Sequence, residues 1–208
     1  MGVTGLILAG GQSRRMRCDK AHLPWGHTTL LQHIMEALRP IVDELLIVVQ
    51  DAQRFRYLNA RVVEDLVPNA HALGGLYTGL RLASHDLCFA CACDAPFLSP
   101  GLIHFLIAQA EGCDAVIPQT REGLLQPLHA VYARSIVPAI EEQLRQRRWD
   151  LRALAQKVRA KIVKPEIVAR YDPVGLSGFN LNTPSEYDTA CDIRTTLTRV
   201  IETRDGCR

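Results

Sequence analysis

The chain has 208 residues, 48% of them hydrophobic, and a formal net charge of +2 at pH 7. That length supports one sizeable core and a single domain, and so small a net charge argues against a nucleic-acid-binding surface. No stretch approaches the ~18 consecutive apolar residues that cross a membrane, and no N-terminal run resembles a signal peptide. We therefore expect a soluble, cytoplasmic protein that binds neither nucleic acid nor membrane.

The first predicted strand, at about residues 5–9, runs directly into Gly10, Gly11 and a basic loop. Glycines let the backbone turn tightly and approach a ligand closely, and the exposed N–H groups of such a loop bind anions. Arg14, Arg15 and Lys20 add cationic donors that can reach phosphate oxygens. The spacing matches neither the P-loop nor the G-x-G-x-x-G pattern, and two glycines after an apolar run, taken alone, are most often a plain turn. Together these residues predict a site for a polyphosphate.

Beyond this loop, short β-rich runs alternate with amphipathic stretches, which predicts βαβ units and a largely parallel sheet in an α/β fold. Capping residues mark four helix starts, at Thr28 or Thr29, Ser99, Asp150 and Thr183. We expect strands at residues 45–49, 61–64, 87–92, 115–118, 128–132 and 161–163. We expect helices at residues 30–38, 52–58, 75–83, 136–147 and 150–158, a helix after Ser99 and a short one after Thr183. A loop at 66–73 should end in Gly74-Gly75 before the helix at 75–83. The domain should span residues 1–191, followed by a mobile tail at 192–208.

Cys88, Cys91 and Cys93 form a C-x-x-C-x-C pattern that invites a metal-binding interpretation. They lie in an apolar run of strand length, where alternation places Cys91 and Cys93 on one face and cannot wrap three thiolates around an ion. The second ligand pair of a tetrahedral zinc site is missing, and seven cysteines do not suggest a disulfide framework. We therefore expect these three cysteines in the core.

Three segments whose residues could bind a ligand fall at predicted strand ends, namely Gly10-Gly11, Asp65 and Asp94. Ligands of open α/β sheets bind beyond the carboxyl ends of the strands, so these segments should converge. An aspartate after a strand, taken alone, is more often only a turn residue or a helix cap. A carboxylate beside a phosphate-binding loop, however, is a natural ligand for Mg²⁺, which takes one or two carboxylates plus phosphate oxygens. His71 and His129 lie near the same loops, and we expect surface or supporting roles for them.

The spacing L-A-G-G-x-S-x-R-M-x-x-D-K, which runs from Leu8 to Lys20, closely resembles the signature of the molybdenum cofactor guanylyltransferase family. The segment C-D-A-P-F around Asp94 resembles the family's C-D-x-P-[FY], whose aspartate binds Mg²⁺ and nucleotide. F-N-L-N-T-P, at residues 179–184, resembles the family's F-x-N-x-N-T-P. The similarity extends from about residue 5 to 190 and is thin between 119 and 176.

This resemblance implies a three-layer, Rossmann-like nucleotidyltransferase fold and a set of site residues. The nucleotide-binding residues would be Leu8, Ala9, Gly10, Gly11, Lys20, Gln50, Asp65 and Asp94, with Gln50 standing where the family commonly has asparagine. Asn180 and Asn182 would contact the second substrate. The catalytic residues would be Arg15, Lys20 and Asp94, with Asp94 as the metal ligand and Mg²⁺ as the cofactor.

The implied reaction transfers GMP from GTP to the terminal phosphate of molybdenum-molybdopterin, forming the guanine dinucleotide cofactor and releasing pyrophosphate. A phosphate monoester is mostly dianionic at neutral pH, so this reaction needs no general base. The resemblance further implies that the product passes to a molybdenum cofactor insertase and to apo-molybdoenzymes. Two alternatives stay open. One is a cytidylyltransferase or sugar-phosphate nucleotidyltransferase of the same fold, and the other is a non-catalytic adaptor that delivers cofactor. Arg17, where the family usually has glycine, keeps the adaptor open.

Overall fold

The computed structural model describes residues 2–10 and 19–205, with side chains described through residue 199. Gly11, Arg14, Arg15 and Arg17 therefore lie outside the described residues, and their expected roles stay predictions.

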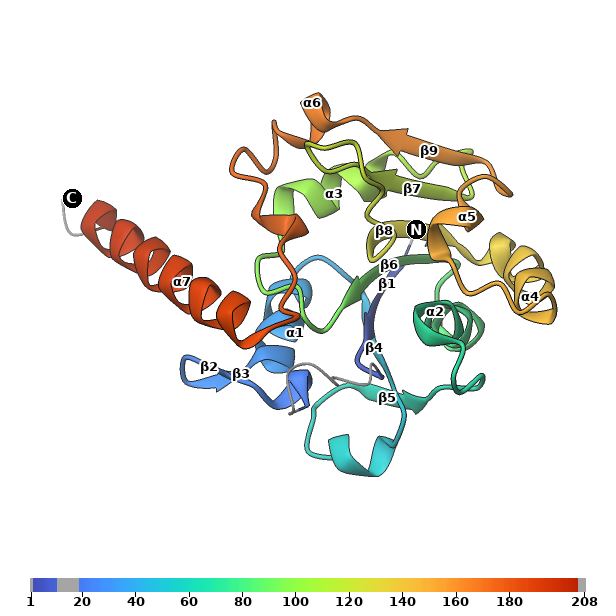
Figure 1. Cartoon of the computed structure of the whole chain (residues 1–208), viewed down its shortest axis with the longest axis horizontal. Coiled ribbons are helices and arrows are strands. Elements are labelled where there is room, and N and C mark those ends of the chain that lie inside the picture. Colours follow the sequence, from blue (N-terminus) through green and yellow to red (C-terminus); the bar gives the residue numbers. More distant parts are fainter. Residues whose placement is uncertain (1, 11–18, 206–208) are drawn as a thin grey trace.

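A seven-stranded sheet forms the centre of the molecule, in the order β5-β4-β1-β6-β8-β7-β9 (Figure 1). Within it β8 runs antiparallel to its neighbours β6 and β7, and the other neighbouring strands pair in parallel. The prediction of a mostly parallel sheet is confirmed. The strands are β1 (Val3–Leu8), β4 (Glu44–Val49), β5 (Arg61–Glu64), β6 (Leu87–Ala92), β7 (Ala115–Pro118), β8 (His129–Ala133) and β9 (Ala160–Val163).

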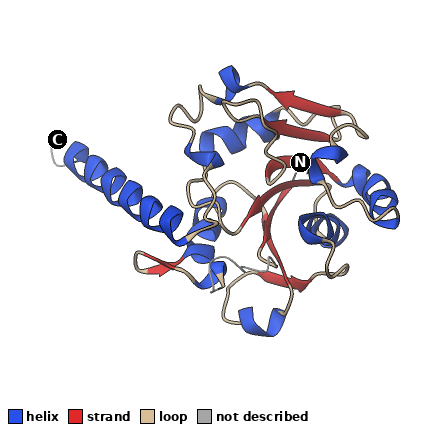
Figure 2. Cartoon of the chain, viewed as in Figure 1, coloured by secondary structure: helices blue, strands red, loops and turns tan. Residues whose placement is uncertain are grey.

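Helices cover both faces of this sheet and give three layers, as Figures 1 and 2 show. On one face lie α1 (Leu30–Leu38), α3 (Pro100–Ala108), α6 (Pro165–Val168) and the start of α7 (Pro184–Asp205). On the other lie α2 (His71–Leu82), α4 (Val137–Arg145) and α5 (Leu151–Leu154). Side chains of each strand alternate between the two cores: in β6, Phe89 and Cys91 enter the first core, while Cys88 and Ala90 enter the second.

Capping residues set several helix starts as the sequence predicts. Thr29 accepts a hydrogen bond from the N–H of Gln32, whose side chain in turn accepts from the N–H of Thr29, so α1 begins in a capping box. Ser99 caps α3 with Pro100 in its first turn. Before α1, the hairpin β2 (Pro24–Trp25) and β3 (Thr28–Thr29) follows a short 3₁₀ helix at Lys20–His22.

The expected start of the helix at residues 75–83 is wrong, because α2 begins four residues earlier, at His71. Gly74 and Gly75 therefore lie within the helix instead of ending the loop. A Cβ added at Gly74 would stand 2.7 Å from the backbone oxygen of Val67, and one at Gly75 would stand 3.2 Å from the side chain of Leu8. The two glycines allow α2 to approach its own preceding loop and β1 closely.

Three further helices differ from the sequence-based expectation. The helix expected at 150–158 ends at Leu154, and the one expected at 52–58 is a 3₁₀ helix at Ala52–Phe55. α7 is a 22-residue helix, Pro184–Asp205, where the pattern suggested a short one. The boundary expected between residues 191 and 192 falls inside α7, which extends away from the rest of the molecule (Figure 1). No helix among the described residues has the length and apolarity to cross a membrane.

Candidate functional site

A cavity of about 510 Å³ lies at the carboxyl ends of β1, β4, β5 and β6, as expected for an open parallel sheet. Every predicted nucleotide-binding residue that the structure describes lines it, although these residues come from segments spread between residues 8 and 94. They are Leu8, Ala9, Gly10, Lys20, Gln50, Asp65 and Asp94. The structure therefore brings together the residues that the sequence pattern selected, and their roles remain predictions.

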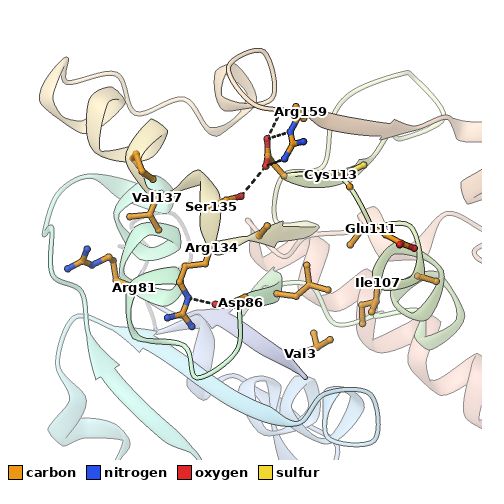
Figure 3. A pocket seen from close by; sticks show the side chains of 17 residues that line it. Val3, Arg81, Asp86, Ile107, Glu111, Cys113, Arg134, Ser135, Val137 and Arg159 are labelled. Carbon is orange, nitrogen blue, oxygen red and sulfur yellow. Dashed lines mark hydrogen bonds and ion pairs between the residues drawn. The ribbon is translucent and has the colours of Figure 1, made fainter. Parts of the chain in front are cut away.

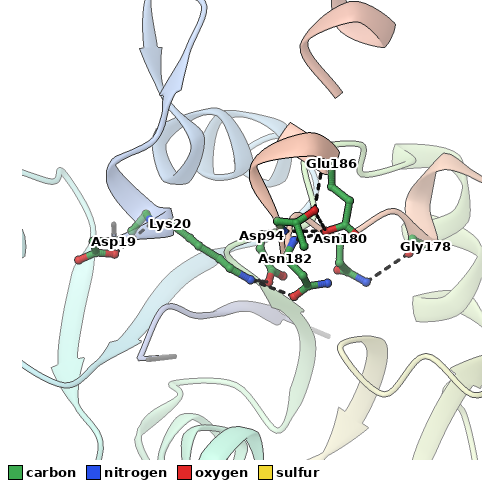
Figure 4. Close-up of polar contacts among 9 residues, drawn as sticks. Asp19, Lys20, Asp94, Gly178, Asn180, Asn182 and Glu186 are labelled. Carbon is green, nitrogen blue, oxygen red and sulfur yellow. Dashed lines mark hydrogen bonds and ion pairs between the residues drawn. The ribbon is translucent and has the colours of Figure 1, made fainter. Parts of the chain in front are cut away.

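Lys20 and Asp94 form an ion pair at the wall of this cavity. The Nζ of Lys20 lies 2.6 Å from Oδ2 of Asp94, and the two side chains are only 13% and 17% exposed. The same Nζ donates to Oδ1 of Asn182 at 3.0 Å (Figure 4). The N–H of Leu181 donates to the backbone oxygen of Asp94 at 2.9 Å, which ties the segment before α7 to the end of β6.

The donor set around Asp94 fits Mg²⁺ better than a metal enclosed by the protein. Among the described residues there is no group of three or more His, Cys, Asp or Glu side chains that could hold an ion. Mg²⁺ does not require such a group, since it binds through one or two carboxylates together with substrate phosphates and water. Asp94 supplies one carboxylate in the cavity, and a cation bound there would compete with Lys20 for it.

Asp65 lines the cavity and also organises the turn that follows β5. Its Oδ1 accepts hydrogen bonds from the N–H of Val67 at 3.0 Å and from the hydroxyl of Thr78 at 2.8 Å. Thr78, fully buried in α2, accepts in turn from the N–H of Leu66 at 3.0 Å. Asp65 can therefore both stabilise the turn and contact a ligand in the cavity. Thr78 of α2 holds its carboxylate in one orientation.

Gly10 has space around it. The nearest protein atom to an added Cβ is Cγ of Gln50 at 3.5 Å, an ordinary contact distance, and the residue has no positive φ. Packing among the described residues thus gives no reason for glycine here, which favours close approach of a ligand as the reason.

Asn69 and His71 line the cavity without having been predicted as site residues. Both have a positive φ, of 70° and 53°, which non-glycine residues adopt at a cost and which is common at functional sites. Asparagine tolerates this conformation, so Asn69 carried a weak signal in the sequence, and the position of His71 near the predicted site loops carried another. The cavity is also lined by Asp19, Val48, Ala72, Gly75, Ala92, Cys93 and Leu128.

His129 and Asn180 lie outside the cavity lining. His129 is 2% exposed, packs its ring against Phe89, and burial lowers its pKa to about 4. Its ring nitrogens have no hydrogen-bond partner among the described residues. Asn180 donates to the backbone oxygen of Gly178 at 3.2 Å, two residues before the asparagine that reaches Lys20. Asn182 is not a lining residue either, but the structure brings its side chain into contact with Lys20, which does line the cavity.

The three strand cysteines are core residues, as predicted. Cys88, Cys91 and Cys93 are free and buried. Burial raises the pKa of Cys88 and of Cys93 to about 12 and also raises that of Cys91, so all three thiols stay protonated at neutral pH.

A second, larger cavity of about 1160 Å³ lies at the opposite edge of the sheet, by the first residues of β1 and β6 (Figure 3). Its guanidinium groups are already engaged: Arg134 pairs with Asp86 at 3.2 Å and Arg159 with Asp114 at 2.9 Å. The hydrogen bonds from Arg159 lower the pKa of Asp114. None of the residues selected from the sequence lines this cavity, so size alone does not identify the site.

Residues 5–162 match the sequence model of the MobA-like NTP transferase domain. A molybdenum cofactor guanylyltransferase from Desulfosudis oleivorans is 34% identical over 190 residues, which cover 90% of this chain and 94% of that protein. A probable molybdenum cofactor guanylyltransferase from Pelotomaculum thermopropionicum is 35% identical over 183 residues, covering 88% and 89% of the two chains.

Solved structures show the same fold. Molybdopterin-guanine dinucleotide biosynthesis protein A from Archaeoglobus fulgidus superposes with a TM-score of 0.82 at 24% identity, covering 93% of this chain and 99% of that chain. A 4-diphosphocytidyl-2C-methyl-D-erythritol synthase from Anaerococcus prevotii superposes with a TM-score of 0.67 at 14% identity, covering 93% and 98%. The fold alone therefore does not determine which nucleotide is used.

Proposed function

Since this chain belongs to the MobA-like NTP transferase family, we propose that it is a molybdenum cofactor guanylyltransferase. It transfers GMP from GTP to the terminal phosphate of molybdenum-molybdopterin, forming molybdopterin guanine dinucleotide and releasing pyrophosphate. The observation that carries the proposal is the cavity that gathers Gly10, Lys20, Asp65 and Asp94 at the carboxyl edge of the sheet. Relatives that align over nine-tenths of their length supply the choice of guanine and of the acceptor.

Positioning and charge neutralisation account for the chemistry. Lys20, with Arg15 from the loop outside the described residues, would neutralise the triphosphate and the departing pyrophosphate. Backbone N–H groups at Gly10 and Gly11 would approach the phosphates. Asp94 would hold Mg²⁺, which supplies further neutralisation of phosphate charge when bound.

The remaining residues would recognise the two substrates. Leu8, Ala9, Gln50 and Asp65 line the part of the cavity around the ends of β1, β4 and β5 and would contact the nucleoside of GTP. Asn182, with Asn180 next to it, would contact the acceptor, whose terminal phosphate is mostly dianionic at neutral pH and attacks without a general base. Among the described residues that line the cavity, His71 is the one imidazole, and no role in proton transfer is needed for it.

The surroundings of the reaction form part of the same proposal. We place the protein in the cytoplasm, with no nucleic-acid or membrane partner, and expect the dinucleotide cofactor to pass to a molybdenum cofactor insertase and to apo-molybdoenzymes. The small net charge of +2 supports the absence of a nucleic-acid partner.

The test is to incubate the purified protein with Mg²⁺, molybdenum-molybdopterin and GTP, CTP or ATP, and to quantify the dinucleotide and pyrophosphate. Dinucleotide formation with GTP alone supports the proposal. Exclusive use of CTP would move the protein to the cytidylyl branch. Binding of the finished cofactor without turnover of any nucleotide would identify a delivery adaptor.

A further inference from the structure

The first turn of α7 begins in a capping box formed by Thr183 and Glu186. The N–H of Glu186 donates to Oγ1 of Thr183 at 3.2 Å, and the N–H of Thr183 donates back to Oε2 of Glu186 at 2.8 Å. Such reciprocal bonds are the ordinary way to satisfy a helix N-terminus. By itself, this arrangement indicates nothing beyond a stable helix start.

Glu186 makes one contact that the cap does not require. Its Oε2 also accepts the N–H of Asn182 at 2.7 Å, although Asn182 precedes the cap. That bond is the largest cause of the lowered pKa of Glu186, which therefore remains a carboxylate at neutral pH. Glu186 thus fixes the backbone of the residue whose side chain contacts Lys20.

Asn182 carries this restraint to Lys20. Its Oδ1 accepts from Nζ of Lys20 at 3.0 Å, and the same Nζ lies 2.6 Å from Oδ2 of Asp94 (Figure 4). Because Lys is a mobile cation on a flexible stem, its direction depends on the acceptors that hold it. Asn182 and Asp94 together aim the ammonium group at the cavity wall.

We propose that Glu186 is a positioning residue, which holds Asn182 so that its carboxamide directs the Lys20 ammonium group toward the nucleotide phosphates. The part of this inference that concerns the nucleotide phosphates rests on the proposed function. The contact chain from Glu186 through Asn182 to Lys20 can be tested without it.

The chain offers a matched control in the capping box of α1. Gln32 occupies the same third helical position as Glu186, and its side chain accepts from the N–H of Thr29 at 3.2 Å. The side-chain partners of Gln32 are Thr28 and Thr29, which are not part of the site. Gln32→Ala therefore removes a comparable cap without loosening Asn182.

The first measurement is the rate at which an amine-reactive acetyl ester acylates Lys20. Mass spectrometry monitors the reaction, and Lys157 is the internal reference. Since Lys20 loses an oriented acceptor, Glu186→Ala should raise its rate about tenfold, while Glu186→Gln and Gln32→Ala leave it unchanged. An unchanged Lys20 rate in Glu186→Ala would overturn the proposal, and this result needs no substrate and no turnover.

The second measurement is a double-mutant cycle on dinucleotide formation. Glu186→Ala should lower kcat about tenfold with little change in the KM for GTP, and Glu186→Gln should restore most of it. In the Lys20→Ala background the same substitution should cost less than about twofold, because its effect passes through Lys20. Equal losses in both backgrounds, or an equal loss in Gln32→Ala, would show a merely structural cap. A wild-type protein that forms no dinucleotide would contradict the proposed function and leave the acylation result to decide the positioning role.

Discussion

Lys20 and Asp94 are 74 positions apart in the chain, yet the ammonium nitrogen of one lies 2.6 Å from a carboxylate oxygen of the other. Both side chains are largely removed from water, where such a pair must offset the cost of desolvation through close contact and further hydrogen bonds. The pair stands at the cavity that we assign to the nucleotide. A cation that binds Asp94 must therefore compete with Lys20, and a phosphate that binds Lys20 must compete with Asp94. The first two predictions follow from this competition.

Asp94→Asn should lower kcat/KM for GTP at least about 100-fold, because it removes the carboxylate that would hold Mg²⁺, and Mg²⁺ helps to balance the phosphate charge. The folded state should persist, since asparagine is nearly isosteric and can still accept from Lys20. Steady-state assays of pyrophosphate release at saturating acceptor measure the effect. Asp86→Asn is the matched control, because Asp86 pairs with Arg134 at the other cavity and should leave turnover near wild type. Full activity in Asp94→Asn would remove this residue from the catalytic machinery.

Lys20→Met should tighten the binding of a divalent cation in the absence of nucleotide by about tenfold, because the Lys20 ammonium group no longer competes for the Asp94 carboxylate. Titration with Mn²⁺, monitored by electron paramagnetic resonance, gives the dissociation constant. The same variant should nevertheless be slower in dinucleotide formation. Weaker cation binding in Lys20→Met would mean that Asp94 is not where the cation binds.

Gly74→Ala should lower the free energy of unfolding by about 1–3 kcal/mol, the range found for overpacked sites. The added methyl group would stand 2.7 Å from the backbone oxygen of Val67, which cannot move without displacing the turn that holds Asp65. Gly101→Ala in α3 is the control, because its Cβ would stand at an ordinary contact distance of 3.7 Å from Tyr171, and alanine has the higher helix propensity. Urea unfolding of the two variants should give shifts of opposite sign. A stabilised Gly74→Ala would show that α2 can withdraw from the loop.

His129 should make stability depend on pH between about 6.5 and 4. Burial lowers its folded-state pKa from 6.5 to about 4, so over this interval the unfolded chain binds a proton that the folded chain does not. Stability contributed by the neutral ring is complete above pH 6.5 and is lost as the pH falls, by up to about 3 kcal/mol. Comparing urea unfolding at several pH values for the wild type and His129→Leu isolates this contribution. Parallel pH profiles of the two proteins would show that the imidazole is not held neutral.

Local signals in the sequence account for much of the fold. The capping residues Thr29 and Ser99 start helices where expected because a side-chain oxygen near a free N–H group acts over a few residues. The apolar runs at β6 and β7 are strands with the expected bounds, since burial on both faces needs a continuous hydrophobic segment. The positions of Gly10, Asp65 and Asp94 after strands were enough to place them at one edge of the sheet.

The close packing of α2 could not be predicted in the same way. Gly74-Gly75 is locally typical of a loop, but both residues lie within α2, where Leu8 and the Val67 carbonyl are too near for larger side chains. α7 continues past residue 191 although its sequence has weak apolar periodicity, with Ala190 buried against the body and Arg194 placed over the ring of Trp25. These outcomes depend on neighbours that are distant in the chain.

The sequence by itself therefore determined the α/β class, the largely parallel sheet, most element positions and seven of the residues that line the cavity, because these follow from hydrophobic periodicity, local hydrogen bonding and a motif of fixed spacing. Only the tertiary structure decided that Lys20 meets both Asp94 and Asn182, that Glu186 holds Asn182 in place, and that Asn69 and His71 line the cavity while His129 is buried. The physical reason is the separation along the chain over which each kind of interaction acts. Caps and strand propensities act between near neighbours, whereas an ion pair, a buried ring or a cavity wall exists only after folding has brought separate segments into contact.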